Sequence, residues 1–160
     1  MRIRDIVAED FLNYKRPSMF IITAVCDWKC CLEAGLDISV CQNAPLISSP
    51  VKDISSERIL QSFSKNPISK AVVIGGLEPF LQFDEIENLI SCFRSHGENC
   101  QFVIYTGYYE NEIQKQINRL KQYPNIIVKF GRFIPNQAHR FDDVLGIELV
   151  SENQYAKQIS

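Results

Sequence analysis

Short apolar runs alternate with amphipathic segments along most of the chain, and the two patterns predict different elements. The runs at 18–25, 70–74, 101–105 and 125–129 are rich in β-branched and aromatic residues, which is typical of buried strands. A weaker run at 144–150 predicts one further strand. These runs therefore predict a sheet whose strands are widely separated in sequence.

Three of the intervening segments have apolar residues at helical spacing. Ser55 is placed to cap a helix that runs to about residue 65. Asp84 and Glu87 fit a capping box at the start of a second helix, and a third is predicted over about 110–122. The predicted apolar faces consist of Ile59, Leu60, Phe63, Ile86, Leu89, Ile90, Phe93, Ile113, Ile117 and Leu120.

Strands that alternate with helices of this length predict βαβ units and a parallel sheet in one α/β domain over residues 1–160. The composition, 46% hydrophobic and 22% charged, is that of an ordinary globular core. Ligands of such sheets bind at the carboxyl ends of the strands. Four features fall there, namely Cys26, Gly75-Gly76, Thr106-Gly107 and Gly131.

Charge and hydropathy exclude some classes of protein and partner. The net charge is −2, and the basic residues are scattered, so no nucleic-acid surface is predicted. We find no apolar run of signal-peptide or membrane-spanning length, so we expect a cytoplasmic protein with no membrane partner. In a reducing cytosol, the six cysteines are expected to be thiols or metal ligands.

Four cysteines fall in the polar loop after the first predicted strand, over about residues 26–43. Cys26, Cys30 and Cys41 are candidate ligands of a [4Fe–4S] cluster, because thiolates hold such clusters and a loop lets three sulfurs converge. Cys31 is an alternative to Cys30. A structural zinc site would use the same thiols, although it usually shows CxxC pairs and a fourth ligand. Simple burial of the cysteines is the plainest alternative.

A glycine-rich turn, Gly75-Gly76-Leu77-Glu78-Pro79, joins a predicted strand to a predicted helix. Two glycines allow a ligand to approach the backbone closely. The turn matches neither GxGxxG nor the P-loop, so nucleotide phosphate binding is not predicted. A tight structural turn is the alternative interpretation.

Taken together, the cysteine loop and this turn resemble the radical S-adenosylmethionine (SAM) superfamily. Cys26-Asp27-Trp28-Lys29-Cys30 is similar to its Cys-Asn-Phe-Arg-Cys opening, and Cys41-Gln42-Asn43 is similar to the end of its cysteine motif. The turn resembles its Gly-Gly-Glu-Pro motif with Leu77 inserted. The chain departs from the usual CxxxCxxC spacing, since ten residues separate Cys30 from Cys41.

Later segments narrow the resemblance to the activating component of anaerobic ribonucleotide reductase. Tyr105-Thr106-Gly107-Tyr108 resembles its Trp-Thr-Gly-Tyr segment. Gly131-Arg132-Phe133 resembles its Asp-Gly-x-Phe segment, with Phe130 in place of Asp, and Ser151-Glu152-Asn153-Gln154 resembles its Ser-Ser-Asn-Gln close. An ordinary strand end and a polar tail are the alternatives for the first and last of these.

The resemblance implies an open partial (β/α) barrel of about five to six mostly parallel strands, because a closed eight-fold barrel needs about 250 residues. It implies a [4Fe–4S] cluster whose fourth iron binds SAM, which is reductively cleaved to a 5′-deoxyadenosyl radical. No catalytic residue beyond the cluster ligands is indicated. The implied SAM-binding residues are Trp28, Val40, Gly75, Gly76, Leu77, Glu78, Pro79, Tyr105 and Thr106.

The implied protein substrate is a glycyl radical enzyme of the anaerobic ribonucleotide reductase type. The implied electron donor is a ferredoxin or a flavodoxin. A radical SAM enzyme that acts on another peptide or a small molecule is one alternative. A zinc- or cluster-stabilised interaction module without enzymatic activity is the other.

Overall fold

Four parallel strands form the centre of the sheet. A computed structural model of the chain describes residues 1–160. Each of these strands is parallel to the next, and they consist largely of buried Val, Ile and Phe, as expected of strands covered on both faces. All four predicted strands of this group are confirmed, with small shifts at their ends. They are β2 (Ser18–Thr23), β4 (Ala71–Gly75), β5 (Gln101–Tyr105) and β6 (Ile126–Phe130).

Three antiparallel strands extend the sheet at its two edges. They are β1 (Arg2–Asp10), β3 (Lys52–Asp53) and β9 (Tyr155–Gln158), and the strand order is β3-β1-β2-β4-β5-β6-β9. The sheet thus has seven strands where we expected five or six, because the outer strands are half-exposed and carry no clear apolar run. It is open, and its interpretation as a partial barrel stays a prediction.

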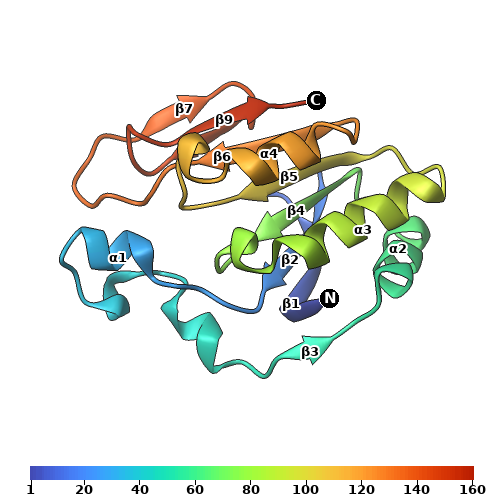
Figure 1. Ribbon diagram of the computed structural model, residues 1–160, viewed down its shortest axis with the longest axis horizontal. Helices are drawn as coiled ribbons and strands as arrows, with labels where there is room; N and C mark the ends of the chain where they lie inside the picture. The colour runs from blue at the N-terminus through green and yellow to red at the C-terminus, as the bar shows by residue number, and fades with distance from the viewer.

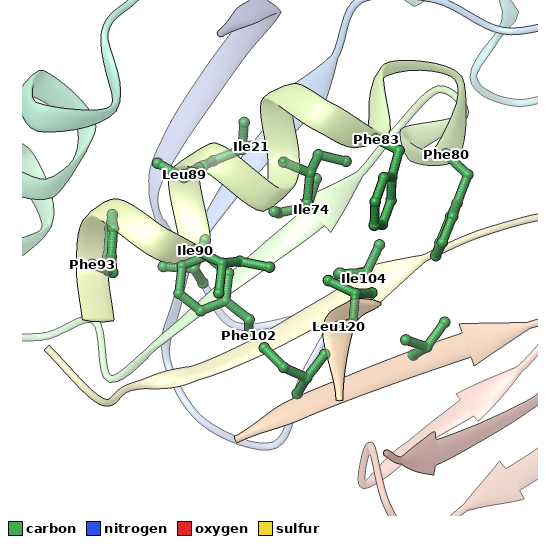
Figure 2. Close-up of a cluster of buried hydrophobic side chains, with 14 of the residues drawn as sticks. Ile21, Ile74, Phe80, Phe83, Leu89, Ile90, Phe93, Phe102, Ile104 and Leu120 are labelled. Carbon is green, nitrogen blue, oxygen red and sulfur yellow. The ribbon is translucent and has the colours of Figure 1, made fainter. Parts of the chain in front are cut away.

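Three helices pack on one face of the sheet (Figure 1). They are α2 (Ser56–Lys65), α3 (Phe83–Ser95) and α4 (Gln114–Leu120). Their apolar residues join those of the sheet in the main core, where Phe93 lies edge-on to Phe102 with ring centroids 5.1 Å apart (Figure 2). All ten residues predicted for the helical apolar faces are buried.

The helix ends test the predicted caps. The Ser55 side chain accepts a hydrogen bond from the backbone N–H of Arg58, as predicted for α2. The capping box at Asp84 and Glu87 is wrong, because the short 3₁₀ turn η3 (Pro79–Gln82) runs directly into α3 and starts the helix earlier. The third predicted helix is split into the 3₁₀ turn η4 (Glu110–Glu112) and α4.

A hairpin of β7 (Arg140–Asp142) and β8 (Ile147–Leu149) covers the opposite face of the sheet. The predicted strand at 144–150 is therefore confirmed only over its second half. Leu145 and Leu149 pack with Tyr14 in a second, smaller core against that face. None of the helices combines the length and the apolar character needed to cross a membrane.

Candidate metal centre

The cysteine loop leaves the sheet at the carboxyl end of β2 and returns through β3. It contains the helix α1 (Lys29–Glu33) and the 3₁₀ turns η1 (Ile38–Val40) and η2 (Ala44–Ser48). Figure 1 shows α1 beyond the arrowheads of β2 and β4. The loop therefore lies over the sheet edge at which parallel α/β proteins bind their ligands.

Cys26 and Cys30 are both half-buried at this edge. The Cys26 sulfur accepts a hydrogen bond from the backbone N–H of Trp28, and the Cys30 sulfur lies so close to Gly107 that a Cβ there would stand 2.7 Å away. Burial raises the pKa of Cys26 to about 12 and also raises that of Cys30, with the nearby Glu78 carboxylate adding to both effects. A positive group is needed to hold these sulfurs as thiolates.

Cys41 lies next to Cys31 rather than next to the first two cysteines. Cys31 is 4% exposed, and burial raises the pKa of its thiol, with the charge and side-chain hydrogen bond of Cys41 adding to the effect. The structure thus brings the four loop cysteines together as two pairs, Cys26 with Cys30 and Cys31 with Cys41. No group of three or more His, Cys, Asp or Glu side chains is arranged to hold a metal ion in this conformation.

The Gly-Gly turn packs directly against the start of the cysteine loop. Gly76 has a φ of +83°, and a Cβ on it would stand 2.7 Å from Cγ2 of Ile22, so both its backbone and its surroundings require glycine. The Glu78 N–H donates a 2.8 Å hydrogen bond to the carbonyl oxygen of Val25, the residue before Cys26. Leu77 and Pro79, which complete the predicted turn, are buried.

Glu78 joins the turn to the end of β5. Its buried carboxylate accepts hydrogen bonds from the N–H of Phe80 (3.0 Å), the N–H of Gly107 (2.9 Å) and the hydroxyl of Thr106 (2.7 Å). Burial raises the pKa of Glu78 to about 7, against the lowering effect of these bonds. We predicted Glu78 and Thr106 as cofactor contacts, and the structure shows their side chains bonded to each other within the protein.

The remaining residues predicted to bind SAM lie in different surroundings. Trp28 has a φ of +59° and begins α1 between Cys26 and Cys30. Val40 is exposed on η1. The Tyr105 hydroxyl donates to the carbonyl oxygen of Asn13 in the β1–β2 connection, and its ring packs against the second core on the hairpin face of the sheet.

Two polar residues near the edge are absent from the predicted site residues. Lys129 is 7% exposed and forms no ion pair; its ammonium donates to the carbonyl oxygen of Gly131 at 3.0 Å, and burial lowers its pKa to about 8. The side-chain oxygen of Asn153 is buried with no hydrogen-bond partner. The signal for Lys129 was a lysine in the otherwise apolar strand β6, and the signal for Asn153 was its place in the Ser151-Glu152-Asn153-Gln154 segment.

The donor set of this edge fits an iron–sulfur cluster in chemistry. Two half-buried thiols, a further pair in the same loop, a buried lysine and an unpartnered amide oxygen suit a group that is both metallic and charged. Structural zinc sites usually have four ligands in tetrahedral geometry. Neither His96 nor His139 is among the groups that shift the pKa values of Cys26, Cys30 and Cys31, so neither histidine offers a further ligand.

Comparison with known proteins gives one match. A family model described as "4Fe-4S single cluster domain" matches residues 20–154. The matched region covers most of the chain and includes the cysteine loop, the Gly-Gly turn, most of β2 and the whole of β4, β5 and β6. No curated protein and no solved structure matches the chain.

Proposed function

The chain belongs to the 4Fe-4S single cluster domain family, and from this we propose that it is a radical SAM enzyme that installs a glycyl radical on a partner enzyme. Cys26, Cys30 and Cys41 hold the [4Fe–4S] cluster in this proposal, with Cys31 as the alternative to Cys30. The partner is of the anaerobic ribonucleotide reductase type. A ferredoxin or a flavodoxin supplies the electron.

The observation that carries the proposal is the contact between the cysteine loop and the Gly-Gly turn. Glu78 bonds through its N–H to Val25 and through its carboxylate to Gly107, and Gly107 lies against the Cys30 sulfur. Three strand ends thereby meet around one thiol. Because a radical SAM site needs a cluster and a SAM-binding turn side by side, this juxtaposition favours that chemistry over a purely structural cluster.

When bound, the cluster supplies one electron that cleaves SAM to methionine and a 5′-deoxyadenosyl radical, which takes a hydrogen atom from a glycine of the partner. The residues of this chain bind and orient. Gly107 leaves room for the Cys30 sulfur, Gly76 lets the turn pack closely on Ile22 at the end of β2, and the buried Lys129 provides positive charge near Cys30. Leu77 and Pro79 exclude water from beneath the turn.

Cys41 needs to separate from Cys31 to act as the third ligand. The segment that carries it supports such a change, because it consists of short 3₁₀ turns and is mostly exposed. Cys31, by contrast, is the buried residue of α1. We therefore assign the middle ligand to Cys30, whose sulfur already faces the Gly-Gly turn and Gly107.

The outer surface of the cysteine loop supports a protein substrate. Large apolar side chains are exposed along it, and a small-molecule enzyme gains nothing from such exposure. These side chains lie on the segment that carries the cysteines, and in the proposal they offer a surface for a partner that closes the site. They are Leu32, Ile38, Val40, Ile47 and Val51.

Anaerobic reconstitution with iron and sulfide, followed by reduction with dithionite in the presence of SAM, tests the cluster and the cleavage. We expect 5′-deoxyadenosine from the wild type and from Cys92→Ala, and none from Cys26→Ala, Cys30→Ala or Cys41→Ala. A protein that binds only zinc, or a cluster that never cleaves SAM, overturns the radical chemistry. Full activity in Cys30→Ala with loss in Cys31→Ala reverses the middle-ligand assignment.

The partner is tested separately by electron paramagnetic resonance. The loaded protein is mixed with a glycyl-radical reductase, SAM and a reductant, and the spectrum is examined for the glycyl doublet. Cleavage of SAM without any doublet favours another peptide or small-molecule substrate. Three departures from the family pattern favour that alternative, namely the altered cysteine spacing, the inserted Leu77, and Phe130, which stands in place of Asp and is fully buried on the helix side of the sheet.

A further inference from the structure

We propose that Arg132 is a positioning residue that holds α1, and with it Cys30, against the carboxyl edge of the sheet. The inference rests on the proposed function in one respect only, namely that the segment around α1 is the cluster loop. No cluster is needed for the contacts themselves. They are made between residues 99 positions apart in sequence, and they join three separate connections of the fold.

The Arg132 guanidinium is buried, and both of its terminal nitrogens are hydrogen-bonded, while its Nε lies 2.6 Å from a Glu33 carboxylate oxygen without hydrogen-bond geometry. Its side chain is 5% exposed, it donates two 2.7 Å hydrogen bonds to the Glu112 carboxylate, and it donates one of 2.9 Å to Glu33. It also stacks on the Tyr109 ring, 4.7 Å from its centroid. Asn153 fixes the Arg132 backbone through a 2.9 Å hydrogen bond to its carbonyl oxygen. Such a charge is held where it is because leaving it unpaired is costly.

Besides the buried Cys31 and the hydrogen bond that the Tyr108 hydroxyl donates to the neighbouring Asp27, the α1 helix depends on charged contacts. It contains five residues, far fewer than an isolated helix needs, and the residue that begins it provides no side-chain cap. Two charged contacts fasten it from outside: Glu33 to Arg132, and the Lys29 ammonium to the Glu112 carboxylate at 2.5 Å. Cys30 lies between Lys29 and Glu33 in the same turn of helix, so these contacts set the height of its sulfur over Gly107.

The bidentate geometry requires arginine. A planar guanidinium reaches Glu112 and Glu33 together, whereas a lysine ammonium is a single point charge. Hydrogen bonding to Arg132, more than any other contact, lowers the pKa of Glu112 to about 2. Both Arg132 and Glu112 are therefore charged at every pH at which the protein would be studied. Removing the contact is expected to change the position of the loop and not the charge of Glu112.

Hydrogen exchange of the metal-free protein tests the inference without the cluster. The amides of Cys31 and Leu32 both bond to the Trp28 carbonyl oxygen and report on α1. We expect Arg132→Met to speed their exchange about tenfold or more. The milder Glu33→Gln, which removes only the α1 side of the contact, is expected to give a smaller increase in the same direction.

Arg119→Met is the matched control. Arg119 also pairs with two carboxylates, Asp84 and Glu87, and also lies over an aromatic ring, that of Phe83, but it contacts no part of the cysteine loop. It should leave the α1 amides at the wild-type rate. Arg132→Lys is expected to fall between wild type and Arg132→Met, because lysine restores the charge but not the fork.

The same variants are then reconstituted, and the loss of the cluster absorbance to an iron chelator is followed. Faster loss in Arg132→Met and Glu33→Gln, but not in Arg119→Met, supports the inference. Unchanged exchange at the α1 amides, or equal change in the Arg119 control, overturns it. If the wild type takes up no cluster while Arg132→Met still loosens α1, the proposed function fails and the positioning of the loop stands. If Arg132→Met does not fold, Glu33→Gln decides the question.

Discussion

The buried acid Glu78 makes the stability of the metal-free protein depend on pH. Burial raises its pKa from 4.5 to about 7, so the folded chain holds this proton more tightly than the unfolded chain does. Between those two values the folded state binds more protons, and its stability must fall as the pH rises. The full contribution is present below pH 4.5, and it is lost once the pH passes about 7.

The size of the effect follows from the difference between the two pKa values. Each unit corresponds to about 1.4 kcal/mol, so the free energy of unfolding should drop by about 3 kcal/mol across this window. That is a large fraction of the roughly 5–15 kcal/mol that stabilises a typical domain. Acids whose pKa is lowered do not change the stability between pH 4.5 and 7 in this way. Glu112, with a pKa of about 2, has already lost its proton in the folded protein well below pH 4.5.

Urea unfolding of metal-free wild type and Glu78→Gln, measured at intervals from pH 4.5 to 8, isolates this group. Glutamine has the same shape but cannot titrate. It donates where Glu78 accepts from Gly107, so its absolute stability will differ, and the comparison uses only the change with pH. We expect the wild type to lose about 3 kcal/mol relative to the variant between pH 4.5 and 7.5.

Parallel curves for the two proteins would refute the reasoning, because they would mean that Glu78 gives up its proton as easily in the folded chain as in the unfolded one. A wild type that gains stability relative to the variant as the pH rises would reverse the sign. In that case the hydrogen bonds from Thr106 and Gly107 outweigh burial, and the carboxylate is charged in the native state.

Two further predictions concern the same edge of the sheet. Gly76→Ala should lower the unfolding free energy by clearly more than Gly35→Ala, as measured by urea titration: both have positive φ, a cost of about 1–2 kcal/mol for alanine, but only Gly76 also meets Ile22. Equal losses would show that Ile22 moves aside freely. In the metal-free protein, mild oxidation with glutathione disulfide should link Cys31 to Cys41, because Cys41 is the cysteine whose charge and hydrogen bonding act on the Cys31 thiol. Peptide mapping that finds another pairing contradicts this placement.

The local patterns of the sequence were sufficient for most elements of the fold. Four β-branched runs gave the parallel strands, and the spacing of Ile59, Leu60 and Phe63 gave the buried face of α2. Apolar periodicity predicts these elements correctly because one face or both faces of each are buried, so the positions of the apolar residues show which face packs in the core. The outer strands escaped because they are half-exposed, and β9 is held by backbone pairing to β6 rather than by an apolar pattern.

The sequence by itself also located the cysteine loop and the Gly-Gly turn, since both are short motifs whose residues are neighbours along the chain. It did not decide how the cysteines pair, and only the fold placed Cys30 against Gly107 and Cys41 beside Cys31. The predicted capping box at Asp84 is wrong because η3 runs directly into α3, so the helix already begins at Phe83.

Tertiary structure alone revealed what surrounds the thiols. Arg132, Glu112 and Glu33 lie on three different connections, and no local pattern marks them as partners. Lys129 looks in the sequence like a surface residue at the end of a strand, yet it is buried, with its ammonium bonded to Gly131 and within reach of the charges of Cys30 and Glu78. A sequence records which residues are apolar and which are neighbours, and that fixes elements and motifs. The pairing of charges across a hundred residues depends on where folding brings distant parts of the backbone together, and this pairing sets the environment of the cysteine loop.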